Sequence, residues 1–373
     1  MRDLTAAVSG YAERFHATVG DEHHVASPLG AWLLLALAAA ADPQDERLAG
    51  VLGMPPRQAT ELVTALLEAP HPLVAAATAV WTTPLVNADR LARWRLPKTT
   101  EVGPLPDQAA LDAWARDHTY GLIERFPLTR TPRMVLLLGS ALATKVSWRD
   151  PFDVGPATLL GAAGPWHLNE ILISKKTHRA FIADTRNAGR VIVHIAAADG
   201  GLEVRSVAAA PDIPPSRVIA AAHEDLQPIS LYDLPLGETD LWQLREQDSP
   251  QAGAEHHRAL LPAWSATSKH QLSDPALGFG TATELLAPLL DIPADGFEAA
   301  QSATARYSRD GFEAAAVTGF AVLTSAMVQR GGTARFADLR FSHPYAVTAI
   351  ATHPDPWSGV PVFSAWVATP EEP

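Results

Sequence analysis

The stretch that most limits the possible folds of this chain is an apolar segment near the N-terminus, AWLLLALAAAAD, which begins at Ala31. Ser27 and Pro28 precede it as an N-cap and a first helical residue, which predicts a helix. The apolar run meets Asp42 after eleven residues, whereas a membrane span needs about 20. A helix that is apolar on all sides has to be surrounded by protein. The chain therefore needs a large core, and its 373 residues with 47% hydrophobic content are enough to build one.

Further helical patterns fill the first third of the chain. Leu4, Val8, Tyr11, Phe15 and Val19 recur at helical spacing and predict an amphipathic N-terminal helix. The segments ERLAGVLGM and ATELVTALLEA continue the helical pattern.

Strand patterns follow, and two long apolar runs without helix caps predict buried strands of a large sheet. These runs are VAAATAVWTT (74–83) and RMVLLLGSALATKVSW (133–148). Between them, residues 107–127 are expected to form a helix that Gly121 weakens and Pro127 ends. After Pro151 the chain turns to short strand-like pieces, and YAVTAIATHPDPWSGVPVFSAWVATP closes it as two strand candidates around a turn. Helices first and strands later predict an α+β fold in a single unit, 1–373.

Charge and cysteine content exclude several classes of function. The formal charge of −12 argues against binding to nucleic acid or to an anionic membrane. The chain has no cysteine, which excludes disulfides, a thiol nucleophile and thiolate metal sites. The N-terminus lacks the apolar core of a signal peptide, so a cytoplasmic protein is expected, with an extracellular location open if a leader has been removed.

A search for catalytic motifs finds no specific signal. GFGTAT at Gly278 lacks the third glycine of a dinucleotide-binding loop. The pairs His23–His24 and His256–His257 are adjacent in sequence, and the HExxH metal motif is missing. Ser140, in LLGSALA, lacks the flanking glycines of a nucleophile elbow. We expect a protein that is not an enzyme and that uses no cofactor or metal.

Several segments, taken together and in order, resemble the serpin family. They are SPLGAWLLLALAAAAD, LDAWARDHTYGLIERF, LPAWSATSKHQLSD, FSHPYAVTAI, PVFSAWVATP and the hinge-like DGFEAAAVT. Lys145, Trp148, Pro151 and Phe152 match the Lys-x-x-Trp-x-x-Pro-Phe signature of that family. The resemblance implies a serpin-like α+β fold, with N-terminal helices packed on a large central mixed sheet plus smaller sheets. It also implies an exposed reactive centre loop at about 311–338.

In the family, the hinge can insert as an extra strand into the main sheet, and small side chains lower the steric barrier to that step. The residues that match the hinge are Gly311, Phe312, Glu313, Ala314, Ala315, Ala316, Val317 and Thr318. Strand alternation would turn Phe312, Ala314, Ala316 and Thr318 inward. DGFEAA also occurs at 295–300, but that copy would give a much longer loop, so the copy at 310–315 is the expected hinge.

The resemblance implies a monomeric suicide inhibitor of a serine protease. Spacing from the hinge glycine gives Ser325–Ala326 as the attacked bond, which suits an elastase-like or subtilisin-like enzyme. Arg330 is the alternative and would suit a trypsin-like enzyme, while spacing back from Pro344 points to Thr333. The alternative function is a non-inhibitory binding or carrier protein with the same fold.

Four positions depart from the family pattern. Phe312 stands where the family has Thr or Ser, and overpacking there is expected to slow insertion. Ser140 and Gln301 align with an asparagine and a histidine of a polar cluster beneath the central strands, and Gly30 replaces a serine of that cluster, while Ser27 is kept. A polar pair formed by Ser140 and Gln301 is expected to substitute for that cluster.

Overall fold

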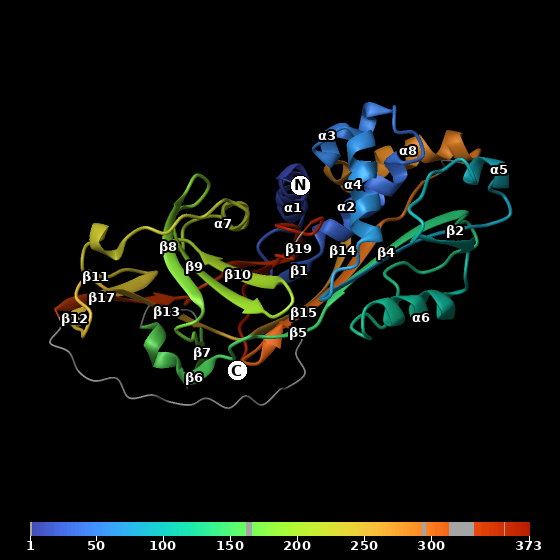
Figure 1. Ribbon diagram of the computed structural model, residues 1–373. Helices are drawn as coiled ribbons and strands as arrows, with labels where there is room; N and C mark the ends of the chain where they lie inside the picture. Colours follow the sequence, from blue (N-terminus) through green and yellow to red (C-terminus); the bar gives the residue numbers. More distant parts are fainter. Residues whose placement is uncertain (1, 162–165, 293–295, 313–331, 354) are drawn as a thin grey trace.

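The computed structural model describes residues 2–161, 166–292, 296–312, 332–353 and 355–373 (Figure 1). The helices in these ranges are α1 (Arg2–Val19), α2 (Pro28–Ala39), α3 (Ala49–Leu52), α4 (Pro56–Glu68), α5 (Ala88–Leu91), α6 (Gln108–His118), α7 (Pro215–Ala222) and α8 (Phe279–Leu290). The first strands are β1 (His24–Ala26), β2 (Val74–Thr82), β3 (Glu101–Pro104), β4 (Leu136–Thr144), β5 (Val146–Ser147), β6 (Asp153–Pro156), β7 (Glu170–Ile173), β8 (Arg179–Thr185), β9 (Gly189–Ala198) and β10 (Leu202–Ala208). The remaining strands are β11 (Gly237–Glu238), β12 (Trp242–Asp248), β13 (Glu255–Leu261), β14 (Trp264–Gln271), β15 (Ala300–Tyr307), β16 (Gly311–Phe312), β17 (Thr333–Arg340), β18 (Tyr345–Ala351) and β19 (Pro361–Val367).

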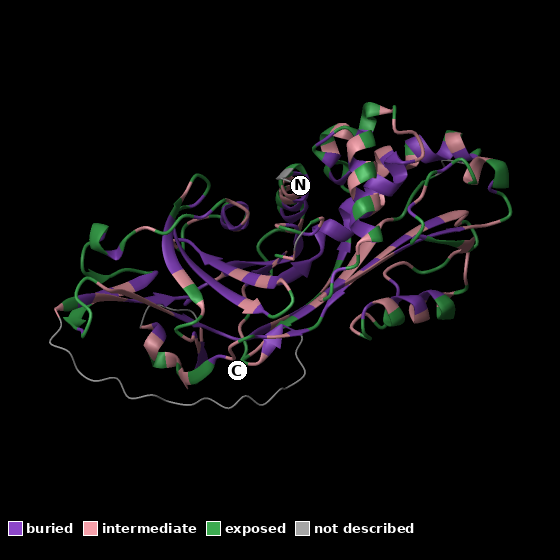
Figure 2. Ribbon diagram, in the orientation of Figure 1, coloured by how far each residue is buried: buried purple, intermediate pink, exposed green. Residues whose placement is uncertain are grey.

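The apolar helix α2 lies at the centre of the helical layer, as its sequence predicts. All of its residues except Leu34 are buried (Figure 2). Ser27 caps it by accepting a hydrogen bond from the Gly30 amide, and Trp32 Nε1 donates to the Leu52 carbonyl at 3.1 Å. The helix packs against α1, α4 and α8 on one side and against β4 and β19 on the other. No helix in the described ranges has both the length and the apolar character of a membrane span.

The long central sheet consists of two parts. One part has the order β3-β2-β4, in which β2 and β4 pair antiparallel from Val74↔Thr144 to Thr82↔Leu136. The other part has the order β14-β15-β16-β5, in which β14 and β15 pair antiparallel over eight residues. Since β5 continues β4 after one residue, the two parts lie side by side and share that strand (Figure 1).

Two six-stranded sheets complete the α+β fold. The first, β1-β19-β18-β10-β9-β8, packs against α1, α2 and α7. The second, β11-β12-β17-β13-β7-β6, lies at the opposite end of the molecule from β2 and β3 (Figure 1). The α+β prediction is confirmed.

The helix expected over 107–127 is wrong in its second half, because α6 ends at His118. Tyr120 and Gly121 have φ angles of 53° and 78°, which a helix cannot continue through. The Thr119 hydroxyl donates to the Ala115 carbonyl and accepts from the Ile123 amide, so it ends the helix by satisfying groups on both sides. The residues that follow α6, 119–128, form a loop that we name the cover segment.

A buried histidine cluster joins α1, β1, β14 and β19. His24 Nδ1 donates to the Glu22 carbonyl, which leaves its Nε2 to accept from His16 Nδ1 at 2.7 Å. His16 Nε2 then accepts from the Ser364 hydroxyl at 2.5 Å. His270 donates to the Val25 carbonyl. The two bonds in which a ring nitrogen accepts, at His24 Nε2 and His16 Nε2, need neutral imidazoles. Burial lowers the pKa of His24 to about 4, assisted by nearby His270.

We expect stability to fall as the pH drops from about 6.5 to about 4, because the unfolded chain then binds protons that His24 in the fold does not. Between pH 7 and pH 5, His24 alone should cost about 2 kcal/mol of unfolding free energy. Urea unfolding of the wild type and of His24→Asn at both pH values measures this term together with its coupling to His16, the direct bonding partner of His24. An equal loss in the two proteins would contradict the role of His24.

Candidate functional site

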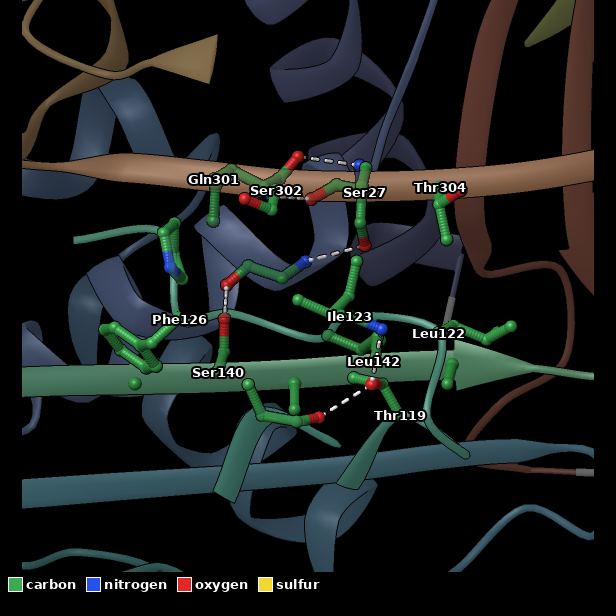
Figure 3. A pocket seen from close by; sticks show the side chains of 18 of the residues that line it. Ser27, Thr119, Leu122, Ile123, Phe126, Ser140, Leu142, Gln301, Ser302 and Thr304 are labelled. Atoms are coloured by element: carbon green, nitrogen blue, oxygen red, sulfur yellow. Dashed lines mark hydrogen bonds between the residues drawn. The ribbon is translucent and has the colours of Figure 1, made fainter. Parts of the chain in front are cut away.

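The candidate site is a slot between β4 and β15, which come from different parts of the central sheet. β4 pairs with β2 along one edge, and β15 pairs with β14 along one edge, so their other edges face each other across the slot. A cavity of about 80 Å³ lies there, lined by residues 138–144 of β4 and 300–304 of β15 (Figure 3). Two strand edges that face each other without a ladder are a place where one more strand could pair.

One end of the slot is already filled by β16, and we name this end, next to Tyr307 and Val146, the head of the slot. Phe312 pairs with Tyr307 of β15 on one side and with Val146 of β5 on the other, and Gly311 pairs with Ser147. Both pairings are antiparallel. The first two residues of the expected hinge therefore form a short strand between β15 and β5.

Phe312 points inward, as the alternation predicts. Its side chain is 3% exposed, and its ring centroid lies 6.3 Å from that of Trp264. The core already holds the ring of Phe312 in a buried position, and the expectation that this residue slows insertion stays a prediction. Phe312 anchors the start of the hinge in the sheet.

The Trp and Phe of the signature hold the turn that leads into β16. Trp148 Nε1 donates to the Ser308 carbonyl at 2.9 Å, and the Trp148 amide donates to the Asp310 carbonyl at 3.0 Å. The Phe152 amide donates to the Arg309 carbonyl at 3.0 Å. These bonds tie residues 308–310 to the end of β5, which fixes where β16 starts.

The floor of the slot is the first turn of α2, which the expected polar cluster binds from both sides (Figure 3). Gln301, on β15, accepts from the Ser27 amide at 2.9 Å and donates to the Ser27 carbonyl at 2.8 Å. Ser140, on β4, donates to the Gly30 carbonyl at 2.8 Å. The predicted polar pair of Ser140 and Gln301 therefore does not form through a bond between the two side chains. Each side chain instead bonds to the backbone of α2, on opposite sides of the slot.

A steric constraint, which the sequence alone did not reveal, explains the glycine at residue 30. A Cβ at this residue would lie 3.1 Å from Leu142 Cδ1 and 3.4 Å from Ser140 Oγ. The missing side chain lets α2 lie close to β4, so that the Ser140 hydroxyl reaches the Gly30 carbonyl directly.

The cover segment forms the roof of the slot through Leu122, Ile123 and Phe126. The Phe126 ring packs against Trp81 and Trp114, and the Phe126 amide donates to Asp112 Oδ1 at 3.0 Å. The sequence pattern predicts a helix over these residues and gives no sign that they form a roof. A strand that entered the slot would have to pass beneath the cover segment.

The rest of the expected hinge and both candidate bonds lie outside the described residues. These residues are Glu313, Ala314, Ala315, Ala316, Val317, Thr318, Ser325, Ala326 and Arg330. Thr333 is the first residue of β17. The loop expected to run to residue 338 is therefore wrong at its far end, because 333–338 belong to a strand.

No protein-family model matches this sequence, and no curated protein does. Solved structures match it over the whole chain. Serpin48 of the insect Tenebrio molitor matches with 14% identity and a TM-score of 0.64, covering 99% of both chains. This chain has the serpin fold. Human thyroxine-binding globulin complexed with thyroxine matches with 14% identity and a TM-score of 0.67, covering 99% of this chain and 98% of that one. The thermophilic serpin Tengpin in its native state matches with 14% identity and a TM-score of 0.63, covering 98% and 94%.

The serpin fold includes proteins of different function, since thyroxine-binding globulin binds a small molecule. Function must therefore be argued from the slot and the loop of this chain.

Gln301→Ala should lower the unfolding free energy by about 1–3 kcal/mol, because the Ser27 amide would lose its partner and the Ser27 carbonyl would be left with the 3.4 Å bond from the Ala31 amide. Ser302→Ala, on the opposite face of the same strand, is the matched control and should have little effect. Chemical unfolding of the three proteins measures the difference. Equal stability of both variants would show that Gln301 does not support α2.

Proposed function

We propose that this protein is a suicide inhibitor of serine proteases. The observation that carries the proposal is β16, in which the first hinge residues pair with β15 and β5 at the head of a slot where the described part of the chain forms no further ladder. A protease would attack a bond in the loop and form an acyl-enzyme through its own serine. The freed hinge would then extend β16 down the slot and drag the enzyme with it.

The register of β16 defines the partners of the inserted strand. Continued in that register, Ala314 would come opposite Ala305 and Thr144. Ala305 and Thr144 are 2% and 3% exposed, so a small side chain suits this position. The run of alanines in the hinge fits a slot whose inner face is already packed.

In the same register, Thr318 would come opposite Gln301 and Ser140. These are the two side chains that bond to the first turn of α2. A threonine hydroxyl can donate and accept, so it can join this polar cluster without leaving a buried group unsatisfied. Thr318, the inward-facing hinge residue that carries a hydroxyl, would thus lie against the polar part of the slot.

Pairing of the open edges supplies the energy for the proposed mechanism. Each new ladder bond contributes about 0.5–1.5 kcal/mol, so a strand of ten residues with two neighbours gains a large total. The native state would be held above the inserted state by a kinetic barrier. Distortion of the dragged enzyme would stop its catalysis, because catalysis tolerates a misplacement of only about 1 Å.

The proposed partner is an elastase-like or subtilisin-like protease that cleaves Ser325–Ala326. Leu323, Thr324 and Met327 flank this bond with the small or apolar side chains that such enzymes accept. Cleavage after Arg330 would move the target to trypsin-like enzymes. The inhibitor itself supplies no catalytic group in this scheme, and we propose that it acts as a monomer.

The alternative is a non-inhibitory carrier protein, which the likeness to thyroxine-binding globulin keeps open. The cover segment favours this alternative, since Leu122, Ile123 and Phe126 close the slot from above. In a carrier, the loop would be cut without insertion.

A protease that recognises the loop should form a complex that survives boiling in detergent. Ala316→Arg should abolish the complex, because this residue would turn a charge into the packed inner face. Ala316→Ser, which keeps a small side chain at the same position, is the matched control and should leave complex formation intact. Denaturing gels of the three proteins with a protease panel give the result, and simple cleavage of all three would exclude inhibition.

The mass of the C-terminal fragment released from the complex identifies the cleaved bond. The fragment should begin at Ala326, and a fragment beginning at Gly331 would indicate a trypsin-like target.

Cleavage of the loop by a non-target protease should raise the melting temperature by roughly 10 °C or more, because the new strand adds several kcal/mol of ladder bonds. Cut Ala316→Arg should keep the melting temperature of the uncut protein. Differential scanning calorimetry before and after cleavage compares them. An unchanged wild-type melting temperature would favour the carrier function.

A further inference from the structure

The loop region returns to the described structure at β17, which lies in the interior of its sheet. β17 pairs antiparallel with β12 from Trp242↔Leu339 to Asp248↔Thr333, and it pairs parallel with β13 on its other edge. β12 in turn pairs with β11. Without the β11–β12 hairpin, β17 would be the edge strand. We name this hairpin, residues 237–248, the latch.

Charged side chains fasten β17 to the latch in addition to the backbone ladder. Asp338 is 6% exposed and accepts from Arg245 of β12 at 2.6 Å and from Arg258 of β13 at 2.8 Å. These two arginines hold the pKa of the Asp338 carboxyl below its usual range against the opposing effect of burial. Arg340 pairs with Glu238 of β11.

Arg335 fastens the beginning of β17 to the segment that leads into the latch. Its guanidinium donates to the Leu234 carbonyl at 2.7 Å and lies 4.6 Å from the centre of the Tyr232 ring. All three of these charged residues of β17 thus contact the latch or the segment before it.

Chain length shows why this fastening matters. Between β16 and Gly332 there are nineteen residues, 313–331. A strand that continues β16 down to Leu136 would use ten of them and would be about 33 Å long. The nine that remain, 323–331, carry the chain to Gly332 over at most about 36 Å when fully extended, which is little more than the length of the inserted strand. They could return at most to the head of the slot, and β17 lies beyond that head, away from β2 and β4 (Figure 1).

We propose that the latch makes loop insertion depend on cleavage. An uncut loop could insert fully only if β17 left its sheet. Without the latch, β17 would be an edge strand held by one ladder. With the latch, its release requires that two ladders and a buried ion-pair network be broken. A cut loop needs no movement of β17. The inference rests on the proposed inhibitory function. It explains how an uncut molecule would keep the slot free of its own loop until a protease cleaves that loop.

A covalent latch tests this proposal. Asp248 and Thr333 are exposed and lie directly opposite each other on β12 and β17, and the chain has no other cysteine to interfere. In the oxidised Asp248→Cys/Thr333→Cys variant, cleavage of the loop should raise the stability by as much as it does in the wild type. Uncut and warmed just below its melting temperature, the oxidised protein should not convert to a heat-resistant form. Loss of the stability gain in the oxidised, cut protein would overturn the proposal, because β17 would then have to move.

A weakened latch gives the opposite test. Glu238→Ala/Arg245→Ala removes two latch contacts, and Arg258→Ala is the matched control, because it removes an Asp338 partner on the β13 side. Hydrogen exchange over 333–340 and conversion of the uncut protein should be about tenfold faster in the latch variant than in the control. Equal rates would overturn the latch. Failure of the cut wild type to gain stability would instead overturn the proposed function, and the latch with it.

Discussion

The facing, unpaired edges of β4 and β15 are the constraint on which the rest of this structure depends. Backbone groups at a strand edge need partners, and among the residues that the structure describes, Gly311 and Phe312 supply them at the head of the slot. The remaining length is closed from below by the first turn of α2 and from above by the cover segment. The sheet is thus built so that one more strand would complete it.

The two ends of the loop are held very differently, and this difference gives the proposed mechanism its direction. On the hinge side, two residues pair with the sheet and one aromatic ring is buried. On the far side, β17 has a ladder on each edge and a buried carboxylate between two arginines. After cleavage, the weakly held end lies in line with the slot, so it is the end that we expect to move.

The sequence predicted the architecture well because its strongest signals are local. The cap at Ser27 and the apolar run after it define α2, and long uncapped runs define β2 and β4. The errors concern contacts between distant segments. The end of α6 depends on how the Thr119 hydroxyl bonds, and the partners of Ser140 and Gln301 depend on the approach of α2, which Gly30 permits. The latch gave no recognisable signal, because its role comes from the strand it covers.

The crystal structure of the protein after a single cut in the loop tests the central claim most directly. The account predicts a new strand between β15 and β4, antiparallel to both, with Thr318 opposite Gln301 and Ser140 and with the cover segment displaced outward. β17 should remain paired with β12 and β13. A cut protein in which pairing still ends at Phe312, with the slot unfilled beneath the cover segment, would contradict the account.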